Sequence, residues 1–428
     1  MNSAQLHDYY KDSSGVVTDS RKLTENCFFV ALRGEHFDGN DFAETAIELG
    51  AKYALVDRPE VAEKNPQLIA VQNTLQSLQE LAQYHRNTLK AKIIALTGSN
   101  GKTTTKELVK NVLAEKFTTH ATHGNLNNHI GVPLTLLGFN EETEIGIVEM
   151  GANHQKEIDF LCQIAQPDFG LITNFGQAHL EGFGSMEGVI KGKSELYEYL
   201  SQTQGTLFLN IDDPHQKKWR THTPHFTFGE DKNADCCFEY IKTNASPLAL
   251  MMEGKIIESQ LYGDYNFSNI GVAVALGKYF GLNFEQINSG VYAYKPNNNR
   301  SQILQKGSNR ILLDAYNANP SSMKASITSF VNNTQKKGIV ILGDMFELGS
   351  HAAVAHQEIL NLLETTDLEQ ILLVGENFDR TESLDSRVHS FPSLEAIKGF
   401  LSQSPFDERE ILIKGSRGMT LESLLEYL

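Results

Sequence analysis

LTGSNGKTTT, residues 96–105, follows a short apolar run, KIIALTG at 92–98, and precedes a stretch with the apolar spacing of a helix. A strand that passes through a glycine-containing loop into a helix is the setting of a phosphate-binding loop. Glycines let the backbone approach a phosphate closely, and the amides at the helix N-terminus face the anion. The loop is short, because Gly98 and Gly101 bracket only two residues.

The loop predicts a nucleoside triphosphate as the ligand class. Lys102 is expected to reach the β- and γ-phosphates, and the Thr103 hydroxyl to bind Mg²⁺. The alternative interpretation is a glycine-rich turn with a solvated lysine. The expected ATP-binding loop residues are Gly98, Ser99, Asn100, Gly101, Lys102, Thr103 and Thr104.

Outward from this loop, buried-strand patterns alternate with helical patterns. EIGIVEMG at 144–151 and DFGLITN at 168–174 are expected strands, the stretch 205–262 is richer in strand, and YKPNNNRSQ at 294–302 has the composition of a boundary. Such alternation predicts an α/β protein with a largely parallel sheet covered by helices. We expect a small N-terminal α/β domain, a central phosphate-loop domain and a C-terminal Rossmann-like α/β domain. Their expected bounds are 1–90, 91–296 and 297–428.

Length and charge agree with this plan and exclude some functions. At about 150 residues per domain, 428 residues predict three domains. The formal net charge of −16 disfavours nucleic-acid and anionic-membrane binding. Anionic small molecules must therefore meet a local cluster of Lys, Arg and backbone amides.

The four cysteines, at positions 27, 162, 236 and 237, show neither metal-binding nor disulfide spacing, which indicates a reduced compartment. The first residues, MNSAQLHDYYKDSSG, lack the features of a signal peptide. No apolar run approaches 18 residues, so no membrane span is expected. We therefore expect a cytoplasmic protein.

Further motifs extend along the whole chain. They are TDSRKLTENCFFVALRGEHFDGNDF (18–42), GNLNNHIGVPLTLL (124–137), EMGANHQKEI (149–158), HLEGFGS (179–185), DAYNANPSSM (314–323), LGDMFELG (342–349) and KGSRGM (414–419). With TGSNGKTT (97–104), and in this order, they give a chain that resembles the Mur ligases of bacterial cell-wall synthesis.

The resemblance implies an ATP-dependent amide ligation. A peptide carboxylate attacks the γ-phosphate of ATP, and an amine then displaces phosphate from the resulting acyl phosphate. The implied substrates are ATP, UDP-N-acetylmuramoyl-tripeptide and D-alanyl-D-alanine, with Mg²⁺ as cofactor. The partners are thus small molecules, with no nucleic acid, and a monomer is expected.

A metal site is expected where strands end. Glu149 closes one buried strand and His179 follows another, at the sheet edge that carries the phosphate loop. A carboxylate, an imidazole, the Thr103 hydroxyl and phosphate oxygens would form an Mg²⁺ site. Without the resemblance, His179 is more simply a structural histidine.

The resemblance also implies that Lys193, 14 residues after His179, carries a carbamate formed from CO₂ and joins the metal site. Lys191 is expected in solvent, and the alternative for Lys193 is likewise a solvated helix lysine. The expected catalytic residues are Lys102, Glu149, His179 and Lys193.

The remaining site residues also follow from the resemblance. Asn266 and Asn269 are expected near adenine, where Tyr265 replaces the family's usual His, while Arg300 reaches the nucleotide and Asp314 binds the ribose or orders Arg300. The expected UDP-substrate residues are Thr18, Asp19, Ser20, Arg21, Asn125, Asn127 and Asn128. The expected dipeptide residues are Asn317, Asn319, Lys414, Ser416 and Arg417. Turn chemistry is the alternative for the asparagines at 125–128, and salt bridges to nearby acids are the alternative for the basic residues at 414–417.

Three other functions compete with this one. A related ligase, of the folylpolyglutamate or tripeptide-forming type, is opposed by GANHQ and NANPSSM. A nucleotide-binding regulatory protein without ligase activity would have lost a metal or carbamate position, yet all are present. A kinase is disfavoured because no separate kinase motif set occurs.

Overall fold

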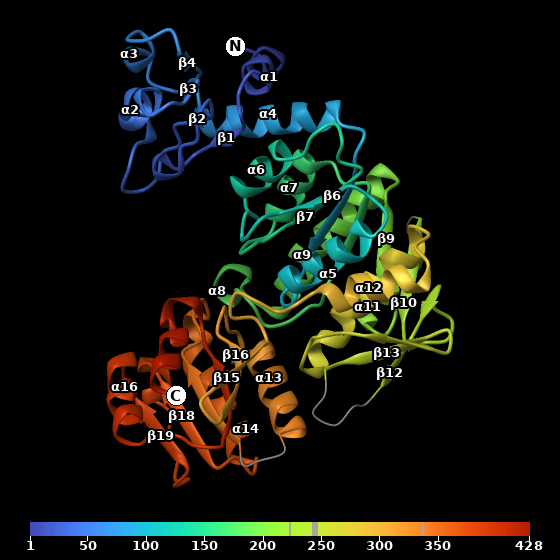
Figure 1. The fold of residues 1–428 in the computed structure, drawn as a ribbon, viewed down its shortest axis with the longest axis vertical. Coiled ribbons are helices and arrows are strands. Elements are labelled where there is room, and N and C mark those ends of the chain that lie inside the picture. Colours follow the sequence, from blue (N-terminus) through green and yellow to red (C-terminus); the bar gives the residue numbers. More distant parts are fainter. Residues whose placement is uncertain (222–223, 242–246, 335–337) are drawn as a thin grey trace.

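A computed structural model describes residues 1–221, 224–241, 247–334 and 338–428. The chain runs along the long axis of the molecule through three α/β domains, each with its own sheet (Figure 1). The expected fold class is therefore confirmed. Within the expected strand-rich stretch 205–262, residues 222–223 and 242–246 lie outside the described residues.

The first domain is built on a four-stranded, wholly parallel sheet in the order β1-β2-β3-β4. Its strands are β1 (Val16–Val17), β2 (Phe28–Val30), β3 (Tyr53–Val56) and β4 (Leu68–Ala70). Its helices are α1 (Ser3–Lys11), α2 (Ala43–Glu48), α3 (Pro59–Ala62) and α4 (Thr74–Thr88). The long helix α4 leads into the middle domain (Figure 1).

The middle domain contains a seven-stranded parallel sheet in the order β11-β10-β9-β8-β5-β7-β6. Its strands are β5 (Lys92–Thr97), β6 (Thr119–Ala121), β7 (Ile145–Glu149), β8 (Phe169–Ile172), β9 (Thr206–Asn210), β10 (His225–Gly229) and β11 (Cys236–Cys237). The central strand β5 is buried at every position after Lys92, as expected of a parallel strand covered on both faces.

Helices and a small second sheet complete this domain. The helices are α5 (Lys102–Ala114), α6 (Gly131–Leu137), α7 (Glu157–Ala165), α8 (Leu180–Phe183), α9 (Met186–Thr203), α10 (Pro214–Lys217), α11 (Phe267–Tyr279) and α12 (Phe284–Ala293). The small antiparallel sheet comprises β12 (Glu239–Ile241), β13 (Ala249–Met252) and β14 (Lys255–Glu258). Helix α5, which starts at the phosphate loop, packs against α11 and α12.

The C-terminal domain contains a six-stranded sheet in the order β15-β16-β20-β17-β18-β19, in which only the β15–β16 pair is antiparallel. Its strands are β15 (Gln302–Lys306), β16 (Asn309–Asp314), β17 (Gly338–Gly343), β18 (Gln370–Val374), β19 (Val388–Phe391) and β20 (Glu410–Lys414). Its helices are α13 (Pro320–Asn333), α14 (Ala352–Glu364), α15 (Glu376–Asp379) and α16 (Leu394–Gln403).

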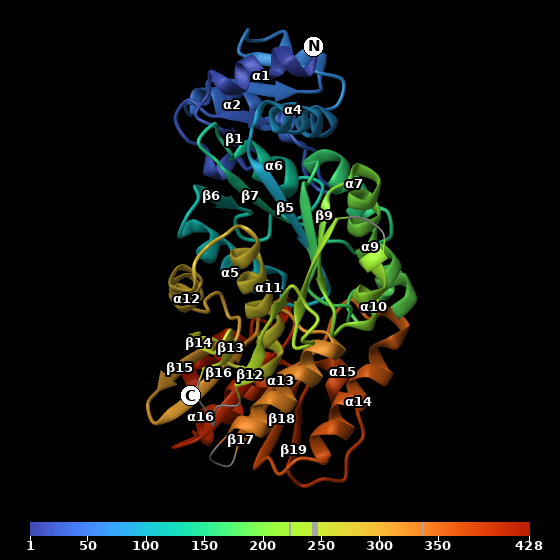
Figure 2. The same ribbon diagram turned by 90° about the vertical axis from the view of Figure 1, so that its right-hand side faces the viewer.

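Parallel strands bring the predicted site residues to common sheet edges. In the middle domain, β5 pairs with β7, so the phosphate loop after Thr97 starts beside Glu149. In the C-terminal domain, β16 pairs with β20 and places Asp314 opposite Lys414. The two domains adjoin in both views (Figures 1 and 2), and α13 lies on the side of the middle domain. Within the described ranges, none of the helices has both the length and the apolar composition that a bilayer crossing needs.

Tyr197 of α9 ties the middle domain together and provides a test of its packing. The side chain is fully buried, and its hydroxyl donates to the Phe208 carbonyl at 2.9 Å and accepts from the Ile172 amide at 3.1 Å. Tyr197→Phe leaves a buried amide without a partner, so we expect the free energy of unfolding of this domain to fall by about 1–3 kcal/mol.

Hydrogen exchange at the Ile172 amide and thermal unfolding measure this effect. The control is Tyr199→Phe, because Tyr199 lies in the same helix and is only half-buried. Equal protection of Ile172 in the Tyr197→Phe variant and the wild type would show that this buried hydroxyl contributes nothing.

Candidate active site

The phosphate loop has a backbone that only glycine permits at two positions. Gly98 and Gly101 have φ angles of +142° and +78°. A Cβ at Gly98 would lie 2.0 Å from the Thr173 hydroxyl, and one at Gly101 would lie 2.5 Å from the Asn269 side-chain oxygen. The loop is therefore clamped between the end of β8 and α11, in the conformation from which α5 begins.

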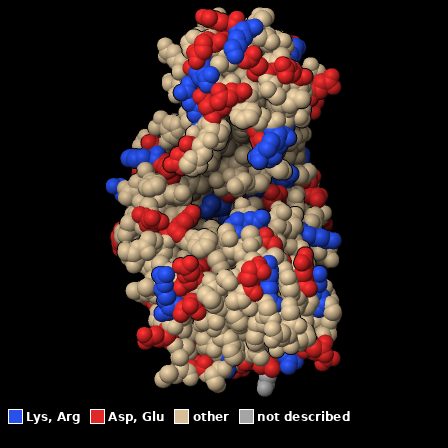
Figure 3. All heavy atoms as spheres, turned by 90° about the vertical axis from the view of Figure 1, so that its left-hand side faces the viewer, with Lys and Arg blue, Asp and Glu red and all other residues tan. Residues whose placement is uncertain are grey.

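This loop lines a cleft of about 800 Å³ between the middle and C-terminal domains. On the face shown in Figure 3, Lys and Arg side chains lie beside a hollow in the surface, despite the acidic composition of the chain. Most predicted site residues line the cleft: Ser99, Asn100, Gly101, Lys102, Thr103, Thr104, Asn125, Asn127, Asn128, Glu149, His179, Asn266, Asn269, Arg300, Asp314, Asn317, Asn319 and Lys414. The cleft lining does not include Gly98, Thr18, Asp19, Ser20, Arg21, Lys193, Ser416 or Arg417.

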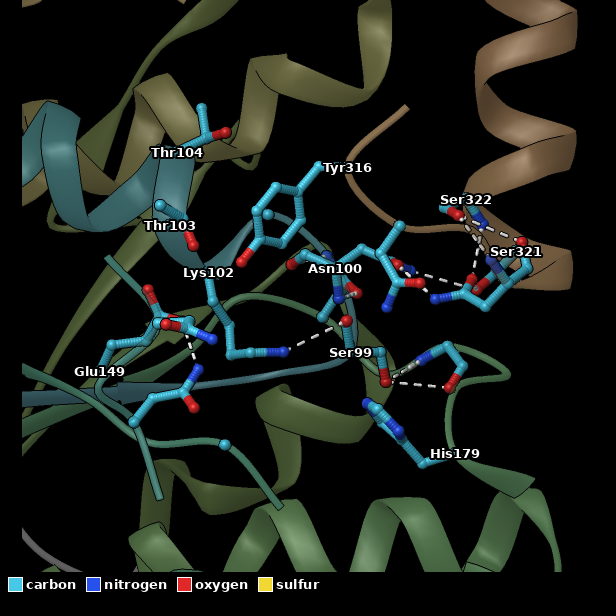
Figure 4. Close-up of a pocket in the computed structure, with 18 of the residues that line it drawn as sticks. Ser99, Asn100, Lys102, Thr103, Thr104, Glu149, His179, Tyr316, Ser321 and Ser322 are labelled. Atoms are coloured by element: carbon cyan, nitrogen blue, oxygen red, sulfur yellow. Dashed lines mark hydrogen bonds between the residues drawn. The ribbon is translucent and has the colours of Figure 1, made fainter. Parts of the chain in front are cut away.

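Lys102 folds back over the loop (Figure 4). Its Nζ atom donates to the Gly98 carbonyl at 2.7 Å and lies 3.4 Å from the Ser99 carbonyl. Burial lowers the pKa of the Lys102 ammonium, and the Glu149 carboxylate opposes this shift. A phosphate group in the loop would replace these two neutral carbonyls with a charged partner.

Glu149 stands at the end of β7 with one oxygen free for a ligand. Its Oε1 atom accepts from the Asn127 side-chain amide at 2.8 Å, and its backbone amide donates to the Thr122 hydroxyl at 2.9 Å. Its Oε2 atom is buried and has no hydrogen-bond partner. The fully buried Lys106 donates from its Nζ atom to the Thr122 carbonyl at 2.6 Å, so it fixes the residue that accepts from the Glu149 backbone.

His179 pairs with a residue that the sequence analysis did not single out. Its Nδ1 atom lies 2.6 Å from Oε2 of Glu347, which belongs to the C-terminal domain. The hydrogen bond from His179 lowers the pKa of Glu347. Both residues have left-handed backbones, with φ angles of 53° and 62°. The only sequence signal for Glu347 was its place in the LGDMFELG motif.

The predicted metal ligands are not assembled around one point by protein atoms alone. Among the residues that the structure describes, no group of three or more His, Cys, Asp and Glu is arranged to hold a metal ion. Glu149 and Thr103 line the same cleft, and His179 lines it from the side of Glu347. Phosphate oxygens of a nucleotide would have to complete any such site.

Lys193 is not a solvated lysine, so the simpler interpretation of this residue is wrong. It is fully buried in α9, its Nζ atom donates to the Ala152 carbonyl at 3.1 Å, and it lies 5.1 Å from the centre of the Phe183 ring. Burial moves the pKa of Lys193 well below its usual value, and the nearby charge of Lys102 lowers it further. Lys191 is exposed, as expected.

Asn266 and Asn269 form a buried polar chain beside the phosphate loop. The Asn269 amide donates to the Asn266 side-chain oxygen at 2.9 Å, and the Asn266 amide donates to the Tyr262 carbonyl at 2.7 Å. The Thr105 hydroxyl donates to Asn269 at 3.0 Å. These asparagines line the cleft and also fix α11 against α5.

Arg300 stacks on Tyr316, with its guanidinium carbon 3.5 Å from the ring centre. Tyr316, another residue that the sequence analysis did not single out, projects into the cleft beside Lys102 (Figure 4). In the part of the chain that the structure describes, no hydrogen bond or ion pair joins Asp314 to Arg300, so the expected ordering of Arg300 is not seen as a direct contact. Asp314 accepts instead from the Lys414 Nζ atom at 2.6 Å and from the Ser301 amide at 3.1 Å.

The predicted dipeptide residues at 414–417 are largely engaged within the protein. Lys414 is buried in its ion pair with Asp314, and Arg417 pairs with Glu422 at 2.9 Å. The alternative interpretation, salt bridges to nearby acids, therefore describes both basic residues. Ser416 is also buried, and its hydroxyl accepts from the Phe346 amide at 2.9 Å.

The predicted asparagines of the cleft differ in the hydrogen-bond partners of their side chains. Asn317 accepts from the Ala318 amide at 2.9 Å. Asn128 accepts from the amides of residues 130 and 131 at the start of α6, which is turn chemistry. Asn127 instead holds Glu149, and the exposed Asn125 lines the cleft.

The predicted uridine-nucleotide residues form a small surface motif in the first domain. Asp19 caps the 3₁₀ turn η1 (Ser20–Lys22), and the Arg21 side chain pairs with it at 2.9 Å. Hydrogen bonds from Arg21 lower the pKa of Asp19 to about 2. The Arg21 side chain is 87% exposed, so it is accessible to a ligand; Thr18 directly precedes this motif.

A phosphate loop facing a second α/β domain across a polar cleft defines a nucleotide-dependent enzyme in which two domains share one site. Three family models match successive parts of the chain: "Mur ligase family, catalytic domain" at 12–92, "Mur ligase middle domain" at 96–277 and "Mur ligase, glutamate ligase domain" at 299–417. The chain belongs to the Mur ligase family.

Individual relatives and solved structures show which members of the family this chain is similar to. UDP-N-acetylmuramoyl-tripeptide–D-alanyl-D-alanine ligases of Bacillus subtilis and Escherichia coli are each 34% identical, over 97% and 96% of this chain and 93% of their own length. A crystal structure of MurF from Acinetobacter baumannii superposes with a TM-score of 0.87 at 29% identity, covering 99% of this chain and 98% of that one. MurF ligase from Thermotoga maritima, in complex with ADP, gives 0.85 at 26% identity, covering 98% and 97%.

Lys102 provides the most direct test of this site. We expect Lys102→Ala to abolish turnover, because the loop then lacks its only side-chain cation toward the transferred phosphate. Phosphate release and circular dichroism measure activity and folding together. The matched control is Lys110→Ala, a lysine further along the same helix α5, which should retain activity. A folded Lys102→Ala enzyme with near-normal phosphate release would refute the assignment.

Proposed function

We propose that this chain joins D-alanyl-D-alanine to UDP-N-acetylmuramoyl-tripeptide in an ATP-dependent amide ligation of peptidoglycan precursor synthesis. The observation that carries the proposal is the cleft, in which the phosphate loop faces the YNANPSSM segment. It is supported by relatives that bear this ligase's name and are 34% identical over 97% and 96% of this chain. The chain is a ligase of the Mur family, and this reaction fits its two-domain site.

In the first half-reaction the peptide carboxylate attacks the γ-phosphate of ATP and ADP leaves, giving an acyl phosphate. Both reactants are anions, so their repulsion has to be screened by cations. Lys102 lies in the loop, and Arg300 lies across the cleft, held by Tyr316. The amides at the start of α5 add donors toward the developing charge.

The cleft also offers oxygen ligands that fit Mg²⁺. The buried Oε2 atom of Glu149 has no hydrogen-bond partner, which is the state of a carboxylate prepared for a cation. Glu149 and the Thr103 hydroxyl would hold the ion, with His179 joining them once it leaves Glu347. Bound Mg²⁺ would neutralise phosphate charge during transfer.

In the second half-reaction the dipeptide amine attacks the acyl phosphate, and inorganic phosphate departs. The protein needs no side-chain nucleophile for this step, because its task is to position the amine against the carbonyl carbon. Asn317 and the segment 414–417 of the C-terminal domain are proposed to receive the dipeptide. Since Lys414 and Arg417 are already paired, the dipeptide carboxylate would compete with Asp314 and Glu422 for them.

The proposal assigns one task to each domain. Residues 1–90 bind the uridine nucleotide through the segment 18–21, residues 91–296 bind ATP, and residues 297–428 receive the dipeptide. We further propose that the enzyme is monomeric and cytoplasmic, because one chain carries all three domains and all four cysteines are free.

A carbamate on Lys193 is the finer part of this proposal. Its neutral amine would add CO₂ and release one proton, which gives an anionic N-carboxylate. The fully buried position and the lowered pKa of Lys193 favour the neutral amine, and Phe183 shields it from water. A carbamate would also place an anion near the Lys102 ammonium, an attraction that the neutral amine lacks.

The proposed function is tested by phosphate release in the presence of ATP, UDP-N-acetylmuramoyl-tripeptide and D-alanyl-D-alanine, with each omitted in turn. We expect full turnover only with all three, and a product mass equal to the sum of the two joined substrates minus water. Replacing the dipeptide with glutamate tests the competing folylpolyglutamate type of activity. Turnover with glutamate and none with the dipeptide would overturn the proposal.

Arg21 tests the assignment of the first domain. Losing one charge-assisted contact to a pyrophosphate costs about 1.5–3 kcal/mol, so Arg21→Ala should raise KM for the UDP substrate by roughly 10- to 150-fold. KM for ATP should stay unchanged, and the neighbouring exposed Lys22→Ala serves as control. A rise in KM for ATP alone would show that this surface serves another purpose.

Lys193 tests the carbamate. We expect Lys193→Ala to be nearly inactive and to regain activity with short carboxylates in solution, whereas Lys191→Ala should be mild because Lys191 is exposed. Removing CO₂ from the buffer should slow the wild type reversibly. A folded, active Lys193→Ala enzyme would exclude a catalytic carbamate at this position.

A further inference from the structure

Asn100, in the middle of the phosphate loop, uses its side chain to form hydrogen bonds with the C-terminal domain. Its Nδ2 atom donates to the Ser321 hydroxyl at 3.1 Å, and its Oδ1 atom accepts from the Asn319 amide at 2.8 Å. Its backbone is equally occupied: its amide donates to Asn174 at 3.1 Å, and its carbonyl accepts from Thr173 at 2.6 Å. This residue therefore has little capacity left for a phosphate.

Asn319 is occupied in the same way. It caps α13, since its Oδ1 atom accepts from the Ser322 amide at 2.9 Å and from the Ser321 hydroxyl at 2.9 Å. Its remaining donor, Nδ2, is the one that reaches Asn100. The hydrogen bonds thus form a closed ring through Asn100, Ser321 and Asn319. Figure 4 shows Asn100 and Ser321 facing each other across the domain boundary.

The ring permits only one orientation of the Asn100 amide. If that amide turned over, its NH₂ group would face the NH₂ group of Asn319, and a hydrogen bond would be replaced by two opposed donors. Gly176 lies beneath the ring: a Cβ there would be 2.5 Å from the Ser321 hydroxyl and 3.0 Å from Asn100 Nδ2. The phosphate loop, the loop after β8 and the start of α13 are therefore fitted to one another.

We propose that Asn100, Asn319 and Ser321 act as an interdomain clasp. They are positioning residues, which set the C-terminal domain against the phosphate loop, and they do not contact ATP or the dipeptide. This inference rests on the proposed function for its kinetic consequences only. The acyl phosphate forms over the phosphate loop and the amine arrives from the side of α13, so the clasp fixes the distance between the two reactants. Nucleotide and dipeptide binding should therefore be coupled through it.

The clasp is tested with Asn100→Ala, Asn319→Ser and the double variant. Serine at 319 keeps a hydroxyl that can cap α13 but is too short to reach Asn100, so the helix end is preserved while the interdomain bond is lost. We expect each single variant to raise KM for D-alanyl-D-alanine about tenfold, with ADP affinity changed less than twofold. The double variant should be no worse than the single ones, because both remove the same contact. Ser393→Ala, which removes the cap of α16 in the same domain, is the matched control.

A second readout does not depend on turnover. Dyes placed at Lys191→Cys in the middle domain and Leu384→Cys in the C-terminal domain, in a Cys237→Ser background, report the interdomain distance; Lys191 and Leu384 are exposed. We expect the clasp variants to broaden and lengthen that distance relative to the parent and the Ser393→Ala control.

Unchanged distances in both clasp variants, multiplicative effects in the double variant, or a tenfold loss of ADP affinity in Asn100→Ala alone would each overturn the proposal. Absence of turnover in the wild-type enzyme would overturn the proposed function, and the distance measurement would still test the clasp.

Discussion

The phosphate loop can bind an anion only if its backbone stays bare and rigid, and its neighbours are arranged around that requirement. Gly98 and Gly101 leave no room for a side chain, because Thr173 and Asn269 press against them. The Ser99 hydroxyl closes onto Gly176, donating to its carbonyl and accepting from its amide, both at 2.9 Å. Rigidity in this loop therefore comes from the end of β8 and from α11, and both elements would need to shift before the loop does.

Local sequence patterns were sufficient to predict the elements that build this frame. Contiguous apolar runs marked β5, β7 and β8, since parallel strands buried on both faces carry no alternation, and glycines marked the loop that follows β5. The order of strands was not accessible in the same way. The register that pairs Asp314 with Lys414 joins residues 100 positions apart, and only that pairing shows that two predicted ligands neutralise each other.

Polar side chains at the domain boundary were the hardest to assign for a related reason. Asn100 and Asn319 are 219 positions apart, and each carries a residue type that suits a turn, a cap or a ligand equally well. Motif membership correctly brought both to the cleft, but hydrogen-bond saturation, which decides their role, depends on the partner. Glu347 and Tyr316 show the converse: they lay inside motifs, yet neither has a chemistry that identifies it before its neighbour, His179 or Arg300, is known.

The cleft holds its charged groups in pairs, and this explains how a chain of net charge −16 accommodates anionic substrates. Lys414 is matched by Asp314 and His179 by Glu347, while Lys102 rests on carbonyls. Outside the cleft, Arg21 of the first domain is likewise matched by Asp19. Ligand binding at such a site is an exchange of partners, so the free energy gained is the difference between the new partner and the old one. For Lys102 that difference is large, because a doubly charged phosphate replaces neutral carbonyls around an ammonium whose pKa burial has already lowered. For Lys414 it is small, because one carboxylate would replace another. Affinity for the nucleotide should therefore reside chiefly in the phosphate loop, whereas the dipeptide has to gain its binding energy from fit between the domains.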